Sequence, residues 1–171
     1  MLGLGALAVV LVAIVGLLLY GRSKVKADGS LVLEGSAVVN APIERGFARI
    51  LSADGLKAWW LTSLGNVDAS PKWPEPGETM KFQMNGQTVT YTAVTIDRPR
   101  RLVARAEYPD AVSTVTQEFA LDGEKRVVYR KTVEARLRPG TGTLKTWMLG
   151  AIIGLSVPAE VKRAAAYASR E

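Results

Sequence analysis

Hydrophobic and polar positions divide the chain into an apolar start, a long region of alternating segments and an apolar end with helical spacing. The start, residues 1–20, reads MLGLGALAVVLVAIVGLLLY and carries no charged side chain. As a helix it would be about 30 Å long, which matches the hydrocarbon core of a bilayer. The pattern predicts a transmembrane anchor over 1–21, a basic linker over 22–30 and a folded domain over 31–171. A cleaved signal peptide is the alternative, although the basic start and cleavage site that it needs are not clear here.

The folded domain begins with a predicted strand and two short helices. The stretch LVLEGSAVVN is rich in β-formers, and Pro42 favours the start of a helix directly after it. Asp54 can cap a second short helix, which carries the neighbouring Trp59 and Trp60. Adjacent side chains diverge on a helix and on a strand, so we expect these two rings to face two different surfaces. The proline-rich residues 65–77 are predicted to form a loop.

Antiparallel strands are predicted over the middle of the chain. Asn85-Gly86 separates TMKFQM from QTVTYTAVTI and favours a tight hairpin. A second hairpin is expected around a loop at Gly123 to Lys125, and RRLVARAEY adds a further strand. The two loops predict the following pairs: Met84 with Gln87, Phe82 with Val89, Met80 with Tyr91, Leu121 with Val127, Phe119 with Tyr129, Gln117 with Lys131, and Val115 with Val133. In this register the inner face of the sheet is apolar except at Gln117 and Lys131.

The apolar end predicts one long amphipathic helix from about Thr143. Its expected inner stripe comprises Leu144, Trp147, Met148, Ala151, Ile152 and Leu155, and continues through Val161 and Ala165. The uncharged stretch 146–159 is too short to span a bilayer, so we interpret it as a core helix. Gly150 and Gly154 have a spacing that packs helices together in lipid. Here we interpret it as allowing close approach to the sheet or leaving room for a ligand.

Composition restricts the chemistry. The chain has no His and no Cys, which excludes an imidazole base, a thiolate and a Cys/His zinc site. The carboxylates are scattered without an inward pair, so we expect no catalytic residue, no metal and no cofactor. Lys131 is the residue of interest, because a lysine in an apolar cavity can hold an anionic ligand group. Alternatively, its ammonium reaches the cavity rim or pairs with Gln117. If Lys131 lies in the cavity, Lys131→Met should keep the fold and weaken binding of anionic or carbonyl-bearing ligands more than that of plain hydrocarbons.

The charge distribution bears on partners and location. All charged residues follow Tyr20, so the net charge of +6 belongs to the rest of the chain and would draw a tethered domain toward anionic lipid headgroups. We favour the simpler interpretation that the charged side chains form solvated outer faces. The first basic residues come directly after the apolar segment, which places the domain on the cytoplasmic side of a single-pass membrane protein. Nucleic acid is not expected, because the sequence contains no zinc spacing, no RNA-binding aromatic signature and no basic helix.

The sequence resembles the START-like (SRPBCC) helix-grip superfamily, in the branch called polyketide cyclase/dehydrase and lipid transport. The resemblance spans about residues 31–169. It rests on VNAPIERGFARILSADGLKAWW, PEPGETMKF, DRPRRLVARAEY and VPAEVKRAAAYASRE. It implies an α+β fold in which a curved antiparallel sheet surrounds a long C-terminal helix, with an apolar ligand between them. A similar tryptophan pair occurs in the branch that stimulates a heat-shock chaperone's ATPase, although the glycine-rich strand that usually follows it is absent here.

The resemblance implies a membrane-anchored binding module for a hydrophobic small molecule, lipid-like or isoprenoid-like. One tryptophan of the pair should then face the mouth of the cavity, while the other covers the core from outside or meets Trp73. The expected ligand-binding residues are Trp59, Trp60, Phe82, Tyr91, Gln117, Phe119, Tyr129, Lys131, Trp147, Met148 and Ala151. Two alternatives stay open: a cyclase- or hydrolase-like enzyme of the same fold, and an interaction domain whose cavity has filled in. The sequence leaves the oligomeric state open.

Overall fold

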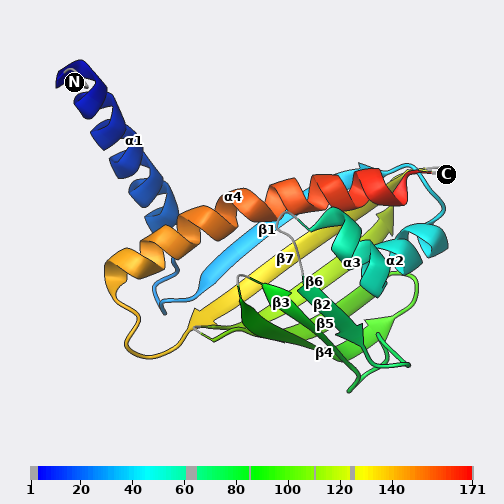
Figure 1. Cartoon of the computed structure of the whole chain (residues 1–171). Helices are drawn as coiled ribbons and strands as arrows, with labels where there is room; N and C mark the ends of the chain where they lie inside the picture. The colour runs from blue at the N-terminus through cyan, green and yellow to red at the C-terminus, as the bar shows by residue number, and fades with distance from the viewer. Residues whose placement is uncertain (1–3, 61–64, 85, 110, 124–125, 171) are drawn as a thin grey trace.

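The computed structural model of the 171-residue chain describes residues 4–60, 65–84, 86–109, 111–123 and 126–170, and its elements are shown in Figure 1. The four helices of this part of the chain are α1 (Leu4–Ser23), α2 (Ile43–Leu51), α3 (Ala53–Trp59) and α4 (Thr143–Ala168). The seven strands are β1 (Leu31–Val39), β2 (Gly65–Ala69), β3 (Thr79–Met84), β4 (Gln87–Asp97), β5 (Arg101–Glu107), β6 (Ala111–Leu121) and β7 (Val127–Leu137). This is the expected α+β order.

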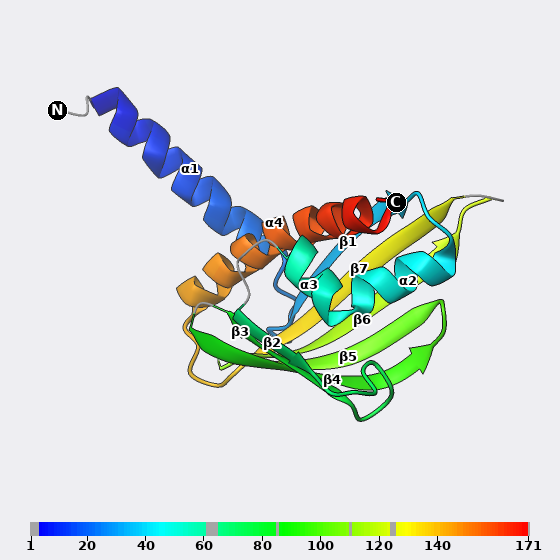
Figure 2. The same cartoon turned by 45° about the vertical axis from the view of Figure 1, so that its right-hand side comes forward.

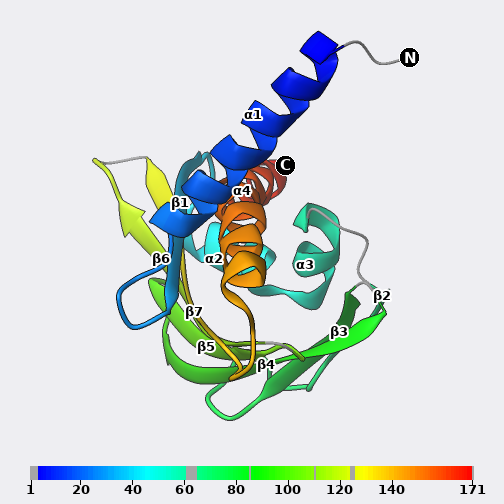
Figure 3. The same ribbon diagram turned by 90° about the vertical axis from the view of Figure 1, so that its left-hand side faces the viewer.

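All seven strands form one antiparallel sheet in the order β1-β7-β6-β5-β4-β3-β2. Strands β2 to β7 follow one another as a meander, and β1 returns to pair with β7. The sheet curves around α4, while α2 and α3 cover the open side next to that helix, as Figures 2 and 3 show. The arrangement agrees with the expected helix-grip fold.

Both predicted hairpin registers are confirmed. Met80 pairs with Tyr91 across β3 and β4, and Gln117 pairs with Lys131 across β6 and β7, together with the other predicted partners. Asn85, Glu124 and Lys125 of the predicted loops lie outside the described residues. Ser113, on the same face as Gln117, is also buried, so the inner face carries one more polar side chain than expected.

Two local predictions are wrong. The first five residues of the predicted loop 65–77 form β2, which pairs with β3 at the edge of the sheet. The cap of α3 is Ser52, whose hydroxyl accepts a hydrogen bond from the Gly55 N–H, while Asp54 lies in the first turn. Either side chain can cap a helix, and the backbone at position 52 is extended as a cap residue requires.

The predicted inner stripe of α4 is confirmed at Ala151, Val161 and Ala165, which are buried, but is wrong for most of the first half of the helix. Four large apolar side chains of that stripe are exposed: Leu144, Met148, Ile152 and Leu155. The buried face is built mainly from small residues, with Gly150, Ala151 and Gly154 in its first half and valines and alanines further on. Small residues occupy this face because other parts of the backbone approach it closely. Hydrophobic periodicity carries no information about this constraint.

Helix α1 rises away from α4 on the side opposite the sheet (Figures 1 and 3), and its large side chains from Val9 to Leu17 are exposed. At its base, a Cβ on Gly150 would lie 2.6 Å from the Gly21 carbonyl oxygen. The Tyr20 hydroxyl donates to the Gly154 carbonyl at 3.2 Å. The Gly150–Gly154 pair therefore packs α4 against α1. The two glycines also lie against Leu31 and Leu33 of β1, so the predicted close approach to the sheet is confirmed, while the contact with α1 was not expected.

Within the described residues, α4 is the one helix long and apolar enough to cross a membrane by length and composition. Core helices pass the same test, and the second half of α4 is buried against the sheet. The stretch Val9–Ser23 of α1 counts as a shorter apolar helix.

Candidate functional site

The two neighbouring tryptophans share one pocket. Trp59 is the last residue of α3, and Trp60 follows it with an extended backbone (φ −60°, ψ 146°). This break in the helix turns the second ring back toward the first, so their centroids lie 5.4 Å apart and both side chains are buried. The expectation that they face two surfaces is wrong, because it assumed that one regular element continues through both residues.

Beneath the tryptophans lies a buried ion pair between the sheet and the C-terminal helix. The Lys131 Nζ on β7 is 2.6 Å from the Glu160 Oε2 on α4, and the two side chains are only 3% and 8% exposed. Lys131 therefore neither reaches the rim nor pairs with Gln117. Each charge is stabilised chiefly by the other, because neither is in contact with bulk water.

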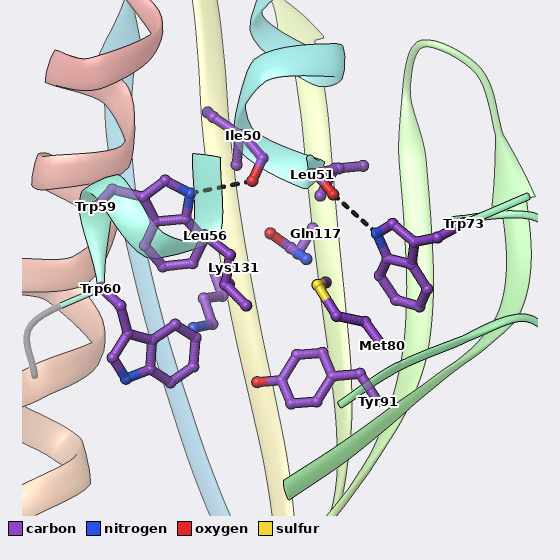
Figure 4. A pocket seen from close by; sticks show the side chains of 10 residues that line it. All are labelled: Ile50, Leu51, Leu56, Trp59, Trp60, Trp73, Met80, Tyr91, Gln117 and Lys131. Carbon is purple, nitrogen blue, oxygen red and sulfur yellow. Dashed lines mark hydrogen bonds between the residues drawn. The ribbon is translucent and has the colours of Figure 1, made fainter. Parts of the chain in front are cut away.

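The tryptophan rings cover the lysine. Its Nζ lies 4.7 Å from the centroid of the Trp60 ring and 5.4 Å from that of Trp59. Both distances allow an attraction between the ammonium and the negative faces of the rings. Figure 4 shows the lysine side chain reaching between the two indoles.

Hydrogen bonds hold two of the three nearby indoles and the deeper polar groups. Trp59 Nε1 donates to the Ile50 carbonyl at 3.0 Å, and Trp73 Nε1 donates to the Leu51 carbonyl at 2.8 Å. No hydrogen bond to a described residue holds the Trp60 indole. Deeper in the core, the Tyr129 hydroxyl donates to the Gln117 Oε1 at 2.7 Å.

The tyrosines around the site stay neutral. Burial, followed by the negative charge of Glu160, raises the pKa of Tyr129. Burial likewise raises the pKa of Tyr91, and it raises that of Tyr108 to about 12. The Tyr91 and Tyr108 hydroxyl oxygens lie 3.3 Å apart. These phenols can exchange hydrogen bonds with a ligand but are poor bases near neutral pH.

The pocket brings together five of the expected ligand-binding residues: Trp59, Trp60, Tyr91, Gln117 and Lys131. Phe82 packs on the Trp60 ring, and Phe119 stacks on Tyr129 behind the pocket. Sequence reasoning missed the remaining lining residues, which are Ile50, Leu51, Leu56, Trp73 and Met80. It also missed Glu160, although its spacing from Val157, Val161 and Ala164 places it on the buried face of α4 and would have indicated it.

Three expected residues lie elsewhere. Trp147 is half-buried under the Arg22 guanidinium, whose Cζ is 5.5 Å from the ring centroid. Met148 is 47% exposed, and Ala151 is buried beside Gly21 of α1. They do not line the pocket because the first half of α4 turns this side toward α1 and solvent.

The pocket is almost full. The space open to the centre of a water molecule is ≈ 10 Å³, which is room for about one water. Within the described residues, no group of three or more carboxylates could hold a metal ion. The arrangement can offer a hydrogen bond from a buried ammonium to a small polar group, provided that a side chain moves aside.

Comparison with known proteins identifies related folds. Residues 40–145 match the family model described as Activator of Hsp90 ATPase homolog 1-like protein, a range that includes the tryptophan pair and Lys131 but not Glu160. No curated protein sequence matches significantly.

Among solved structures, the Zhui aromatase/cyclase of a Streptomyces species is similar, with a TM-score of 0.68 and 15% identity over 82% of this chain and 94% of that one. A Bacillus halodurans protein has a TM-score of 0.61 and 14% identity over 81% and 96%. A protein from Arthrobacter aurescens has a TM-score of 0.58 and 15% identity over 82% and 86%. At these identities the likeness establishes the fold alone.

Proposed function

The chain belongs to the family of Activator of Hsp90 ATPase homolog 1-like proteins, in the START-like (SRPBCC) superfamily, and we propose that it is a membrane-tethered module that binds a small hydrophobic molecule. The buried pair of Lys131 and Glu160 under the two indoles carries this proposal. Apolar residues of similar volume are often at least as stabilising as a buried ion pair. A pair kept in such surroundings is therefore a candidate for function.

The chemistry of the pair narrows the ligand to a lipid-like or isoprenoid-like molecule with a carbonyl or hydroxyl oxygen. The ammonium has three N–H donors, and one of them is used by Glu160. A neutral ligand oxygen can accept another. A ligand carboxylate is disfavoured, because the pair is already neutral and an added anion would be buried without a partner.

Trp60 is the side chain that would move aside when the ligand binds. The pocket holds about one water, so any larger molecule must displace a wall residue. Hydrogen bonds fix Trp59 and Trp73. Among the described residues, the Trp60 indole makes no hydrogen bond and is held by the rings of Trp59, Phe82 and Tyr91 and by the Lys131 ammonium. Movement of this ring would uncover the ammonium without breaking the ion pair.

Helix α1 would provide the tether. Its exposed apolar surface ends at Tyr20, where the Lys24 Nζ lies 5.0 Å from the ring centroid and Arg22 lies over Trp147. Aromatic and basic side chains at the end of an apolar helix are typical of a membrane interface. The basic residues on this side favour a cytoplasmic domain.

Ligand binding is tested with a long-chain ketone and its matching alkane, using full-length protein in lipid nanodiscs. The double variant Lys131→Met with Glu160→Leu removes both charges, so neither is left buried without its partner. Wild type should bind the ketone about tenfold more tightly, since one hydrogen bond to a charged donor contributes on the order of 1.5 kcal/mol. The double variant should lose this preference, while removal of the exposed pair Arg101 and Glu118 should not affect it. An equal preference in all three proteins contradicts the proposal.

A second function, an interaction domain with a filled cavity, is favoured by the ≈ 10 Å³ volume. Native mass spectrometry of protein extracted in lipid nanodiscs separates the two. A co-purified small molecule supports the binding module. Its absence, together with no binding of ketone or alkane, supports the filled domain.

A further inference from the structure

The first half of α4 presents an apolar face that the domain leaves uncovered. Leu144, Met148, Ile152 and Leu155 recur at intervals of three and four residues, so they lie along one side of the helix. Their exposed fractions range from 47% for Met148 to 58% for Leu144 and Leu155. Such a row of large apolar side chains on a surface marks contact with another apolar phase.

This face is continuous with α1. Gly150 and Gly154 bring the base of α1 against the same half of α4, with Gly21 packed on the backbone of Trp147. In Figures 1 and 3, α1 leaves α4 on the side away from the sheet. The outer side of α4 therefore points toward the region into which α1 extends.

The charged residues of α4 and of residues 1–27 are basic, with the exception of Glu160. The sequence of α4 has a single acidic residue, Glu160, and that side chain is buried in the ion pair with Lys131. Residues 1–27 contain no acidic residue and include Arg22, Lys24 and Lys26. An apolar face on a helix without an exposed carboxylate, packed against a segment that ends in three basic residues, fits the surface of a bilayer that contains anionic lipids.

We propose that the first half of α4 lies in the headgroup region of the bilayer that holds α1, with Leu144, Met148, Ile152 and Leu155 inserted among anionic lipids. The proposal rests on the tether proposed above. A second contact beside the tether fixes the domain's orientation and keeps the pocket close to the membrane surface. The domain is then a docked module, in which a molecule dissolved in the bilayer has a short path to Trp60.

Site-specific fluorescence tests this arrangement in the full-length chain, which has no cysteine of its own. Three single variants, Ile152→Cys, Val10→Cys and Val94→Cys, carry an environment-sensitive dye in vesicles of phosphatidylcholine and phosphatidylglycerol. Val94, on β4, is the matched control because it is apolar and 50% exposed. Nitroxide-labelled lipid should quench the dyes at 152 and 10 severalfold more than the dye at 94. Replacing phosphatidylglycerol by phosphatidylcholine should weaken quenching at 152 alone.

The outcomes separate this inference from the tether. Strong quenching at 10 together with quenching at 152 no greater than at 94 overturns the contact of α4 and leaves the tether intact. Absence of quenching at 10 overturns the tether, and the inference with it. A dye at 152 that is shielded from water only at high protein concentration, without lipid quenching, assigns the face to a second copy of the chain and overturns the proposal.

A charged variant supplies an independent check. Met148→Glu with Leu155→Glu adds two carboxylates to exposed positions, so the fold should be retained. Quenching at 152 should then fall to the level at 94, while quenching at 10 stays unchanged. Thr92→Glu, on the sheet, should leave both values unchanged. If the α4 variant keeps its quenching at 152, the apolar face is not in the membrane.

Discussion

The Nζ of Lys131 lies 2.6 Å from the Oε2 of Glu160, so a buried ion pair joins β7 to α4, the helix that the sheet surrounds. The partners are 29 residues apart in the sequence. The sequence-based expectation was that Lys131→Met keeps the fold. The ion pair predicts a loss of stability instead, because the change leaves the Glu160 carboxylate buried without its cation.

Lys131→Met should lower the free energy of unfolding by about 3–5 kcal/mol, the usual cost of breaking a buried pair from one side. Denaturant unfolding of full-length protein in detergent, followed by tryptophan fluorescence, measures the change. Adding Glu160→Leu should recover most of the loss. As a control, Arg101→Met breaks an exposed contact with Glu118 and should change stability by less than about 1 kcal/mol. A Lys131→Met variant as stable as wild type would show that the ammonium does not stabilise the buried carboxylate.

Trp60→Ala should open the pocket. Removing a buried indole costs about 3–5 kcal/mol and leaves a cavity next to the Lys131 ammonium. If Trp60 is the side chain that moves aside for the ligand, small ketones should bind this variant more tightly than wild type, since no ring has to be displaced. Calorimetric titration measures the affinity. Trp73→Ala is the comparison, because the Trp73 indole is held by the Leu51 carbonyl, and tighter binding there instead would move the opening to the other wall.

Stability should fall at alkaline pH. The folded-state pKa of Tyr129 and Tyr91 is raised by burial, and that of Tyr108 is raised to about 12, above the ordinary value near 10. A raised pKa means that the stabilisation is complete below about pH 10 and is lost as the pH rises through the folded-state values. Ultraviolet titration should show these three tyrosines ionising only above about pH 10, together with unfolding. Tyr129→Phe should reduce the loss of stability between about pH 10 and pH 12.

Gly150→Ala should separate α1 from α4. The added Cβ would lie 2.6 Å from the Gly21 carbonyl oxygen, which is part of the backbone and cannot yield without a helix shift. Spin labels at Val10→Cys and Val94→Cys should give a narrow distance distribution in wild type and a broad one in this variant. Gly16→Ala is the matched control, because nothing lies within 4 Å of its added Cβ. Equal distributions in all three proteins would mean that the glycine contact does not hold α1 in place.

Anchoring should depend on α1. Full-length protein should sediment with membranes and resist high-salt washing, because salt screens charges but leaves the apolar contact of about 20 residues intact. A chain that begins at Tyr20 keeps the hydroxyl contact to Gly154 and should bind membranes much more weakly than full-length protein, with binding that falls as salt is added. Mature protein isolated from cells with its first residue near Ala27 would instead indicate a cleaved signal.

Local sequence determined the parts of the fold in which neighbouring residues decide the outcome. Tight turns and strict alternation set both hairpin registers, because a shift by one residue would turn every apolar side chain to the solvent. The same alternation identified Gln117 and Lys131 as inward polar residues, and both line the pocket. The family resemblance likewise followed from turn and core positions.

Only the tertiary structure determined which side chains contact Trp60 and Lys131. Trp60 leaves the helix because α3 ends at Trp59, where it packs against the core. The sequence alone does not determine whether the helix ends before or after Trp60. The partner of Lys131 depends on which face of α4 meets the sheet. Hydrophobicity favoured the face with large side chains, but close approach of α1 and β1 required the face with Gly150 and Gly154. Large side chains were thereby left outside and Glu160 was turned inward, because backbone proximity limits side-chain size more strictly than apolar character does.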